Sequence, residues 1–347
     1  MVAKFIKMEF PINPLSYACI AIDKLSSIYT NRTAIYYHMS DNDGNLSGEM
    51  LGRIFNGSEL VPFTYHRKLT TIKPLMVFVD VTPDFAQLLD LYCGKYWTNV
   101  NQILIIDHHK DRYEYYKQKL GHTESENPVI IYIYSEMPAT YMVGKIAECL
   151  NCQWYYGILN TIVEAVSLYD VSLNDKPDSL FKDSTILRTK QEKNCSDACH
   201  NIEFWCRNNS MQITEKCTNY CGLQHGLQQI LLEGNIIKNT YTNIAKLILN
   251  KYQIDLSNKK FVGKFENLNQ HIDKIAMCNV PNYDFGHFFE SKPNEIAIAF
   301  TYVDTNKISV NCFSSQYDLL KLCPGLGGHP SEAGCEIQEI SQLFIEK

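Results

Sequence analysis

The sequence predicts an α/β protein whose first half forms a doubly wound, mostly parallel sheet. Short apolar runs, many of them β-branched, alternate there with segments of helical periodicity. After residue 172 the sequence becomes more polar and has helical periodicity, and patterns typical of short strands return after residue 256. We therefore expect three parts: a sheet domain over 1–172, a helical connector over 173–255 and a smaller C-terminal α/β domain over 256–347.

Four strands of the first domain are predicted from apolar runs, which are typical of strands covered on both faces. They are Thr33–Tyr37, Leu75–Val79, Gln102–Ile106 and Pro128–Tyr134. Helical periodicity follows three of these four strands, the exception being Gln102–Ile106. The predicted helices are Leu46–Phe55, Pro83–Tyr92, Pro138–Leu150 and Tyr155–Tyr169.

The remaining elements are predicted in the same way. The polar stretch Asn174–Ser184 indicates a loop, and Thr185–Arg207 and Gly222–Asn250 have helical patterns. Three strands are expected in the C-terminal domain, at Lys260–Val262, Glu295–Tyr302 and Lys307–Phe313. A glycine-rich loop, Gly325–Pro330, follows the last of them.

Composition narrows the classes of protein. With 347 residues, 45% of them hydrophobic and 20% charged, the chain is typical of a globular protein of two domains. No run is long and apolar enough to cross a bilayer, and Met1–Phe10 lacks the apolar core of a signal peptide, so we expect a cytoplasmic protein without a membrane partner. The net charge of −6 offers no basic excess for long duplex nucleic acid. A small anionic substrate held at metal ions is compatible with it.

The 13 cysteines are expected to be free thiols, because nothing in the sequence indicates secretion. Five of them cluster between Cys195 and Cys221. Their spacing differs from the paired knuckles of structural zinc sites, and the sequence assigns the cluster no role.

Acids and imidazoles stand where the predicted elements end. His38–Gly44 follows the first strand, Asp80 follows the second, Asp107-His108-His109 follows the third, and Asp170 ends the Tyr155 helix. Taken singly, each could be a turn or a helix cap. The carboxyl ends of parallel strands meet at one edge of a sheet, so we expect these groups to converge there.

The residue types suit metal chemistry. Carboxylates and imidazoles together favour divalent ions such as manganese, iron or zinc. A carboxylate that bridges two ions, with several terminal ligands, is the arrangement that activates water and binds phosphate oxygens in two-metal hydrolases.

Five motifs resemble the ordered motifs of DHH-family phosphoesterases. They are Tyr-His-x-x-Asp-x-Asp-Gly-x-x-Ser-Gly (37–48), Val-Asp-Val-Thr-Pro (79–83), Ile-Asp-His-His-Lys (106–110), Tyr-Asp-Val (169–171) and Gly-Gly-His-Pro-x-x-Ala-Gly (327–334). Each motif is short, but their order and spacing make the resemblance specific. The first motif is similar to that of the oligoribonuclease-like (nanoRNase) branch.

The resemblance implies two divalent metal ions, usually manganese, with magnesium or cobalt as alternatives. The ligands it implies are His38 and Asp41 for the first ion, Asp43, His108 and Asp170 for the second, and Asp80 as the bridge. Asp107 would orient its neighbours. His109 would face the substrate and contact phosphate or protonate the leaving oxygen.

The resemblance also implies that the C-terminal domain binds substrate, with the active site in the cleft between the two α/β domains. The expected substrate-binding residues are Gly327, Gly328 and His329, with Ser135 from the first domain. Glycine lets backbone N–H groups approach an anion closely. The sequence departs from the family at Leu326, which interrupts a run of glycines, and near Phe313-Ser314, where many relatives carry an arginine.

These features favour an enzyme that hydrolyses short single-stranded oligonucleotides or dinucleotides, RNA before DNA, to mononucleotides. A phosphoadenosine phosphate phosphatase and a cyclic-dinucleotide phosphodiesterase are alternatives of the same chemistry. An alternative of another class is a non-catalytic protein that binds or sequesters nucleotides. Cleavage polarity and a homodimer are left open by the sequence.

Overall fold

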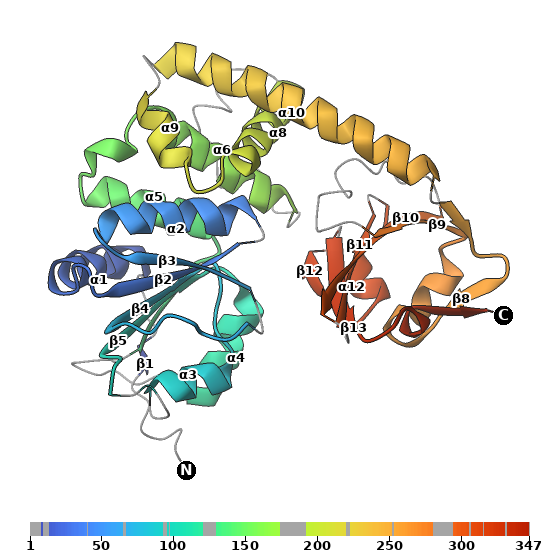
Figure 1. The fold of residues 1–347 in the computed structure, drawn as a ribbon, viewed down its shortest axis with the longest axis horizontal. Helices are drawn as coiled ribbons and strands as arrows, with labels where there is room; N and C mark the ends of the chain where they lie inside the picture. The colour runs from blue at the N-terminus through green and yellow to red at the C-terminus, as the bar shows by residue number, and fades with distance from the viewer. Residues whose placement is uncertain are drawn as a thin grey trace. The chain divides into compact units, whose positions relative to one another are not determined.

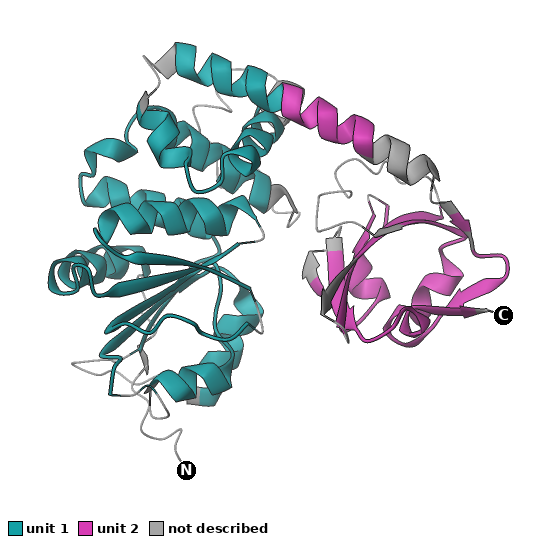
Figure 2. Ribbon diagram, in the orientation of Figure 1, with its two compact units in different colours: residues 1–171, 178–235 teal, residues 172–177, 236–347 magenta. Residues whose placement is uncertain are grey.

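The computed structural model folds as two compact units, residues 1–171 with 178–235 and residues 172–177 with 236–347 (Figure 2). It describes residues 8–9, 14–39, 41–64, 67–92, 96, 98–120, 130–173, 192–219, 223–251, 253–279, 294–304, 307–314, 316–329 and 332–346. Each unit has its own core. The predicted division into three parts stays a prediction.

Unit 1 is built on a sheet of six parallel strands in the order β1-β6-β5-β4-β2-β3. They are β1 (Met8–Glu9), β2 (Thr33–His38), β3 (Glu59–Phe63), β4 (Leu75–Val79), β5 (Gln102–Asp107) and β6 (Ile130–Tyr134). The four predicted strands are present, and the sheet is parallel as predicted. From β2 the chain passes to β3 on one side, whereas β4, β5 and β6 follow on the other, so the order reverses between β2 and β4.

Helices cover both faces of this sheet (Figure 1). They are α1 (Pro14–Ile28), α2 (Asn42–Ile54), α3 (Phe85–Tyr92), α4 (Lys110–Leu120), α5 (Ala139–Cys149) and α6 (Ile158–Leu173). The side chains of successive strand residues point to opposite faces of the sheet. Tyr36 packs toward α3 and α4, and Tyr37 packs toward α2, α5 and α6. The doubly wound α/β fold predicted from sequence is confirmed.

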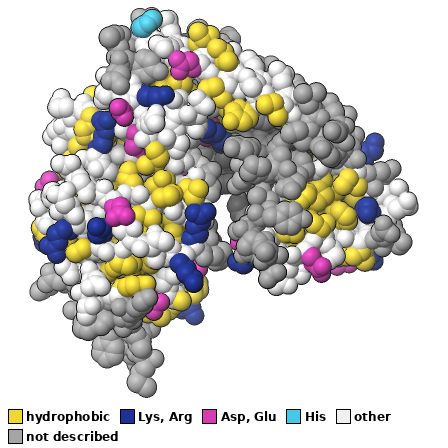
Figure 3. Space-filling model, in the orientation of Figure 1, with side chains coloured by type: hydrophobic (Ala, Val, Ile, Leu, Met, Phe, Trp, Pro, Cys, Tyr) yellow, Lys and Arg dark blue, Asp and Glu magenta, His cyan; other side chains and the backbone are white. Residues whose placement is uncertain are grey.

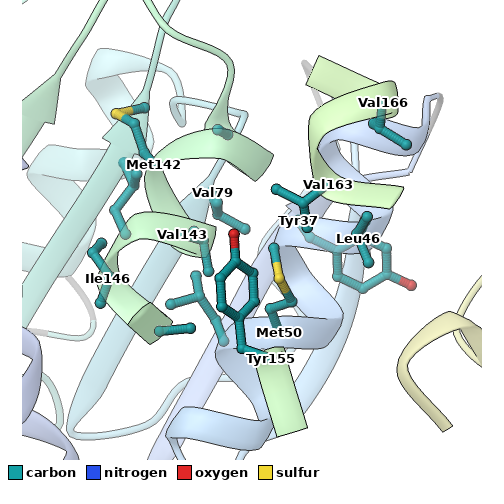
Figure 4. Packing of buried hydrophobic residues seen from close by; sticks show 14 of the residues in the cluster. Tyr37, Leu46, Met50, Val79, Met142, Val143, Ile146, Tyr155, Val163 and Val166 are labelled. Carbon is teal, nitrogen blue, oxygen red and sulfur yellow. The ribbon is translucent and has the colours of Figure 1, made fainter. Parts of the chain in front are cut away.

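The larger core lies between the sheet and the helices α2, α5 and α6. In Figure 4, Tyr37 and Val79 of the sheet face Met50 of α2 and Val143 of α5. The connector helices extend this core: α8 (Glu192–Asn208), α9 (Ile213–Asn219) and the first part of α10 (Leu223–Lys251). The two connector helices predicted from sequence are thus present as α8 and α10, whereas the predicted loop Asn174–Ser184 lies outside the described residues.

A buried carboxylate on α2 joins this helix to α9. Glu49 of α2 accepts hydrogen bonds from the backbone N–H groups of Ile213 (3.1 Å) and Thr214 (2.7 Å) at the start of α9. Asn42, in the first turn of α2, donates through Nδ2 to the carbonyl oxygen of Glu203 in α8 at 3.0 Å. The helix that follows β2 is therefore held by the sheet on one side and by the connector on the other.

Unit 2 contains a smaller mixed sheet in the order β12-β13-β11-β10-β9-β7 and a two-stranded sheet, β14-β8. The strands are β7 (Gln253–Asp255), β8 (Lys259–Phe261), β9 (Lys274–Asn279), β10 (Glu295–Asp304), β11 (Lys307–Phe313), β12 (Gly327–His329), β13 (Glu332–Ile337) and β14 (Phe344–Glu346). The short helix α12 (Leu319–Leu322) packs with them. Among the described residues no helix is long and apolar enough to cross a membrane.

Two glycines one turn apart in α2 give a matched test of how closely this helix packs on β2. A Cβ at Gly48 would lie 2.6 Å from Cβ of Tyr37, whereas one at Gly52 would lie 3.1 Å from the movable tip of Leu60. We expect Gly48→Ala to lower the free energy of unfolding by about 1–3 kcal/mol through overpacking. Gly52→Ala should leave it unchanged or raise it by up to about 1 kcal/mol, the helix preference for alanine. Urea unfolding measures both, and equal stability of the two variants would contradict the packing described.

Candidate metal centre

The predicted polar groups converge at the carboxyl edge of the sheet in unit 1. His38 is the last residue of β2, and Asp80 directly follows β4, so the two flank the point where the strand order reverses. Asp107 ends the next strand, β5. Open parallel sheets bind ligands at this kind of position, because the loops on either side of it part in opposite directions.

The first of two His/Asp groups joins β2, the start of α2 and the end of β4. Nδ1 of His38 lies 2.7 Å from Oδ2 of Asp41 and 3.5 Å from Oδ2 of Asp80. Asp41 also caps α2, since its Oδ1 accepts a hydrogen bond from the N–H of Gly44 at 2.9 Å. His38, Asp41 and Asp80 can each offer one ligand atom within 4.8 Å of the others.

The second group joins α2, the β5–α4 loop and α6. Nε2 of His108 lies 3.6 Å from Oδ2 of Asp43, and Nδ1 of His108 lies 3.9 Å from Oδ2 of Asp170. Asp43, His108 and Asp170 also offer ligand atoms within 4.8 Å of one another. The two groups contain the six residues expected as ligands from the sequence, and their role as metal ligands stays a prediction.

Asp80 lies between the two groups. Its Oδ2 faces His38, whereas its Oδ1 lies 3.1 Å from Nε2 of His108. The residue is buried and has a φ of 56°, a left-handed conformation that non-glycine residues seldom adopt. Its own N–H donates to the carbonyl oxygen of Ile106 at 2.9 Å, which fixes the backbone against β5. Unusual backbone of this kind is concentrated at functional sites.

The carboxylate of Asp43 is oriented by the start of helix α5. Its Oδ2 accepts a hydrogen bond from the N–H of Ala139 at 2.9 Å, and its Oδ1 accepts one from the N–H of Thr140 at 2.7 Å. Oγ1 of Thr140 donates to the carbonyl oxygen of Asp43 at 2.8 Å. Helix α5 therefore gains an anionic cap, and Asp43 is held at two points.

Asp107 holds His109 rather than His108. Its Oδ1 lies 2.7 Å from Nδ1 of His109 and accepts a hydrogen bond from the N–H of the same residue at 3.1 Å. Its Oδ2 accepts a hydrogen bond from Oγ1 of Thr82 at 2.5 Å. The side chain of His109 is 31% exposed, against 10% for His108, so His109 presents the more open imidazole.

Burial and mutual repulsion shift the pKa values of the cluster. The pKa of Asp43 is raised well above its usual value by burial and by the charges of Asp80 and Asp170. Burial likewise raises the pKa of Asp170 to about 6. Burial disfavours a charged His108, but Asp170 and Asp80 outweigh it and raise its pKa. Burial also works against a charged Asp80, but hydrogen bonds with His108 and His38 outweigh it and hold its pKa well below the usual value.

This donor set fits divalent cations. Buried carboxylates that raise one another's pKa are a charge excess that a cation would offset. Oxygen and imidazole nitrogen are the ligand types that manganese, iron and zinc accept. A third combination, Asp80 with His108 and His109, meets the same 4.8 Å limit. The structure therefore contains potential metal-binding His/Asp clusters.

The comparisons with known proteins agree with this fold. No protein-family model and no curated protein matches the sequence. A solved DHH domain, described as a member of the s1p family of ribosomal proteins, superposes with a TM-score of 0.54 at 13% identity and covers 93% of this chain and 86% of that one.

The chain has the fold of a DHH-domain protein.

Two further solved structures superpose on this chain with lower TM-scores. An exopolyphosphatase-related protein from Bacteroides fragilis has a TM-score of 0.43 at 12% identity, covering 93% of this chain and 92% of that one. A pGpG-specific phosphodiesterase from Vibrio cholerae has a TM-score of 0.31 at 11% identity, with 88% and 93% covered. Both scores lie below 0.5, so the assignment of the DHH fold rests on the first structure.

The expected substrate-binding residues lie in separate parts of the fold. Gly327, Gly328 and His329 form β12 of unit 2, and the side chain of His329 lies outside the described residues. Ser135 directly follows β6 in unit 1, and its Oγ accepts a hydrogen bond from the N–H of Met137 at 3.2 Å. Ser135 also lines a cavity of about 60 Å³ whose walls are mainly apolar. A role of these residues in substrate binding stays a prediction.

The two departures from the DHH motifs have visible structural consequences. Leu326, which interrupts the glycine run, is buried and packs into the core of unit 2, so it does not occupy the outer surface of the loop. At Ser314, near the position where the resemblance led us to expect an arginine, Oγ accepts hydrogen bonds from the N–H groups of Gln316 and Tyr317. The aliphatic part of Lys264 lies beside Gly325, about 4.0 Å from the position of a Cβ there.

Two threonines that support the cluster were not found by sequence reasoning. Thr82 holds Asp107, and Thr140 holds Asp43, which is 97 residues away in the chain. Thr82 lies within the quoted Val-Asp-Val-Thr-Pro motif, which was a usable signal. Nothing in the sequence links Thr140 to Asp43, because the contact depends on how α5 meets α2.

The pairing of Asp107 with His109 can be tested by titration. Burial opposes a charged His109, but the Asp107 carboxylate outweighs it and raises the pKa of the imidazole. We therefore expect Asp107→Asn to lower the pKa of His109, measured in metal-free protein by NMR of the imidazole resonances assigned through His109→Gln. Asp84→Asn, which removes a carboxylate that pairs with Arg112, is the control and should leave the pKa of His109 unchanged. An unaltered pKa in Asp107→Asn would contradict the pairing.

Proposed function

We propose that the protein is a phosphoesterase of the DHH family that depends on two divalent ions, most simply manganese, and hydrolyses short oligonucleotides or dinucleotides to mononucleotides. The observation that carries the proposal is the position of Asp80, whose two oxygens face the imidazoles of two separate His/Asp groups. Such a carboxylate is what a bridged pair of ions requires.

The proposed ligands of the two ions are the residues of the two His/Asp groups. His38, Asp41 and Asp80 would hold one ion, and Asp43, His108 and Asp170 would hold the other, with Asp80 shared. Two ions bound there would lower the pKa of a bound water and bind phosphate oxygens.

His109 is proposed as the group that meets the substrate. Because Asp107 accepts from its Nδ1–H and raises its pKa, His109 keeps a proton on Nε2 to a higher pH than a free imidazole would. From Nε2 it can donate to a phosphate oxygen or to the leaving oxygen. Thr82 donates to the other oxygen of Asp107 and so helps to orient this carboxylate, whose pKa is lowered against burial by the neighbouring His109.

The distribution of charge favours a small substrate. On the face shown in Figure 3, Lys and Arg side chains of the described residues are interspersed with acidic and uncharged ones. With a net charge of −6, a continuous grip on a long phosphate backbone is not supported. The motif resemblance to the oligoribonuclease-like branch supports short oligoribonucleotides as the substrates.

Substitution of the bridging residue tests the mechanism. We expect Asp80→Asn to reduce manganese-dependent hydrolysis by more than the ~10- to 100-fold typical of residues that only support a metal ligand. Asp41→Ala and His108→Ala should do the same, with urea unfolding showing that each variant is folded. Asp111→Asn, an exposed acid in the first turn of α4, is the matched control. Full turnover in the Asp80, Asp41 or His108 variant would refute the assignment.

A substrate panel separates the alternatives. Products are scored with manganese for pApA, longer oligoribonucleotides, phosphoadenosine phosphate and cyclic dinucleotides, and the expected result is mononucleotide from pApA and short oligoribonucleotides. Release of phosphate from phosphoadenosine phosphate alone would favour the phosphatase. Tight binding of every nucleotide with no product would favour a sequestering protein.

Ion binding should weaken as the pH falls. In the metal-free protein Asp170 has a pKa of about 6, and the pKa values of His38 and His108 are raised. A cation must displace these protons, so its apparent affinity is lower at pH 5.5 than at pH 7.5. Calorimetry with manganese in two buffers of different ionisation enthalpy measures both affinity and proton release. Binding without proton release at pH 6 would contradict the cluster as described.

A further inference from the structure

A stacked pair of tyrosines stands beside the candidate metal centre and takes no part in it. Tyr134 is the last residue of β6 and is the direct register partner of Asp107 on β5. Neighbouring strands are about 4.8 Å apart, so the two backbones are adjacent at the carboxyl edge of the sheet. Both side chains lie on the face covered by α3 and α4: Tyr134 packs with that core, as does Ile105, two residues before Asp107.

The second tyrosine comes from the helix that begins after His109. The rings of Tyr113 and Tyr134 are stacked, with centroids 4.3 Å apart and an interplanar angle of 14°. The N–H of Tyr113 donates to the carbonyl oxygen of His109 at 3.1 Å. The register with Asp107 and the first turn of α4 therefore bring the backbones of Tyr134 and Tyr113 close to those of Asp107 and His109.

Tyr113 packs between Tyr134 and the core of unit 1. Its ring contacts Tyr134 by stacking and the buried Tyr132 edge-on, at 5.7 Å and 69°, while Nζ of Lys117 lies 5.3 Å from its centroid. Among the described residues, no ring other than Tyr113 and no cation packs on Tyr134, which is partly exposed. Tyr113 thus fixes one face of the Tyr134 ring, and a ring fixed in this way adds flat apolar area to a contact at low cost in side-chain entropy.

We propose that Tyr134, backed by Tyr113, stacks on a nucleobase of the substrate while the neighbouring phosphate lies at His109. A nucleobase is the flat π-system that such a surface accepts without sequence preference. Inorganic polyphosphate has no group that would use the surface, so the pair favours a nucleotide over a polyphosphate. The inference rests on the proposed function and deepens it by assigning a base-recognition position within unit 1.

Matched substrates and variants test the inference. KM and kcat are measured with manganese for pApA and for its analogue in which both bases are replaced by hydrogen. In wild type, KM for the abasic analogue should be about 10- to 100-fold higher, the loss expected for one stacking contact. Tyr134→Ala should raise KM for pApA by a similar factor and leave the abasic substrate unchanged. Tyr134→Phe, which keeps the ring, should behave as wild type.

Tyr115→Ala is the control, because Tyr115 is an exposed tyrosine of the same helix that packs on Phe85 and Tyr116 instead. Equal loss on both substrates in Tyr134→Ala would show a purely structural role and overturn the inference, as would an unchanged KM for pApA. Calorimetric binding of pApA to wild type and Tyr134→Ala separates the two proposals. Weaker binding by the variant supports stacking even where pApA is not hydrolysed, an outcome that would refute only the proposed function.

Discussion

The arrangement of the candidate metal centre depends on Asp80. Its carboxylate is buried at the reversal of strand order and faces an imidazole on either side, His38 through one oxygen and His108 through the other. The left-handed backbone at this residue is the conformation that places the side chain between β2 and β5. A residue in that conformation costs of the order of 1–3 kcal/mol, so the surrounding contacts must over-determine it.

Backbone N–H groups and a threonine hydroxyl, rather than lysine or arginine side chains, hold the carboxylates of Asp43 and Asp107 beside their imidazole neighbours. Asp43 is held by the start of α5, and Asp107 is held by Thr82 and by the N–H of His109. Lysine or arginine in these places would neutralise the carboxylates and compete with cations for them. Neutral donors orient the oxygens and leave the negative charge available, which is the state that a metal site needs.

Those parts of the fold that carry a strong local pattern could be predicted from the sequence. The apolar runs of β2, β4 and β5 marked the strands, and the polar residue after each run marked the sheet edge. The strand β3 was missed because it is an edge strand with an exposed Glu59 and with Pro62, features that weaken a strand pattern. The helix α4 was missed because its composition is strongly polar, with little apolar periodicity.

Contacts between distant segments could not be predicted in this way. The stack of Tyr113 on Tyr134 and the hydrogen bonds of Thr140 with Asp43 depend on how α4 and α5 meet the sheet. For the motif 106–110 the resemblance implied separate roles for Asp107, His108 and His109, but the sequence did not show that Asp107 pairs with His109. His108 faces Asp43, Asp80 and Asp170, and Asp107 holds His109 in the more exposed position.

This division bears on the choice between an enzyme and a sequestering protein. A protein that only binds nucleotides needs an anion site, which cations or helix N-termini can supply, and it has no use for a separately held imidazole. Here Asp107 raises the pKa of His109 and has its other oxygen engaged by Thr82, an arrangement that the proposed function would use for proton donation. The departures from the DHH motifs lie in unit 2, where Leu326 turns into the core. These departures therefore lie outside unit 1, which carries the His/Asp groups.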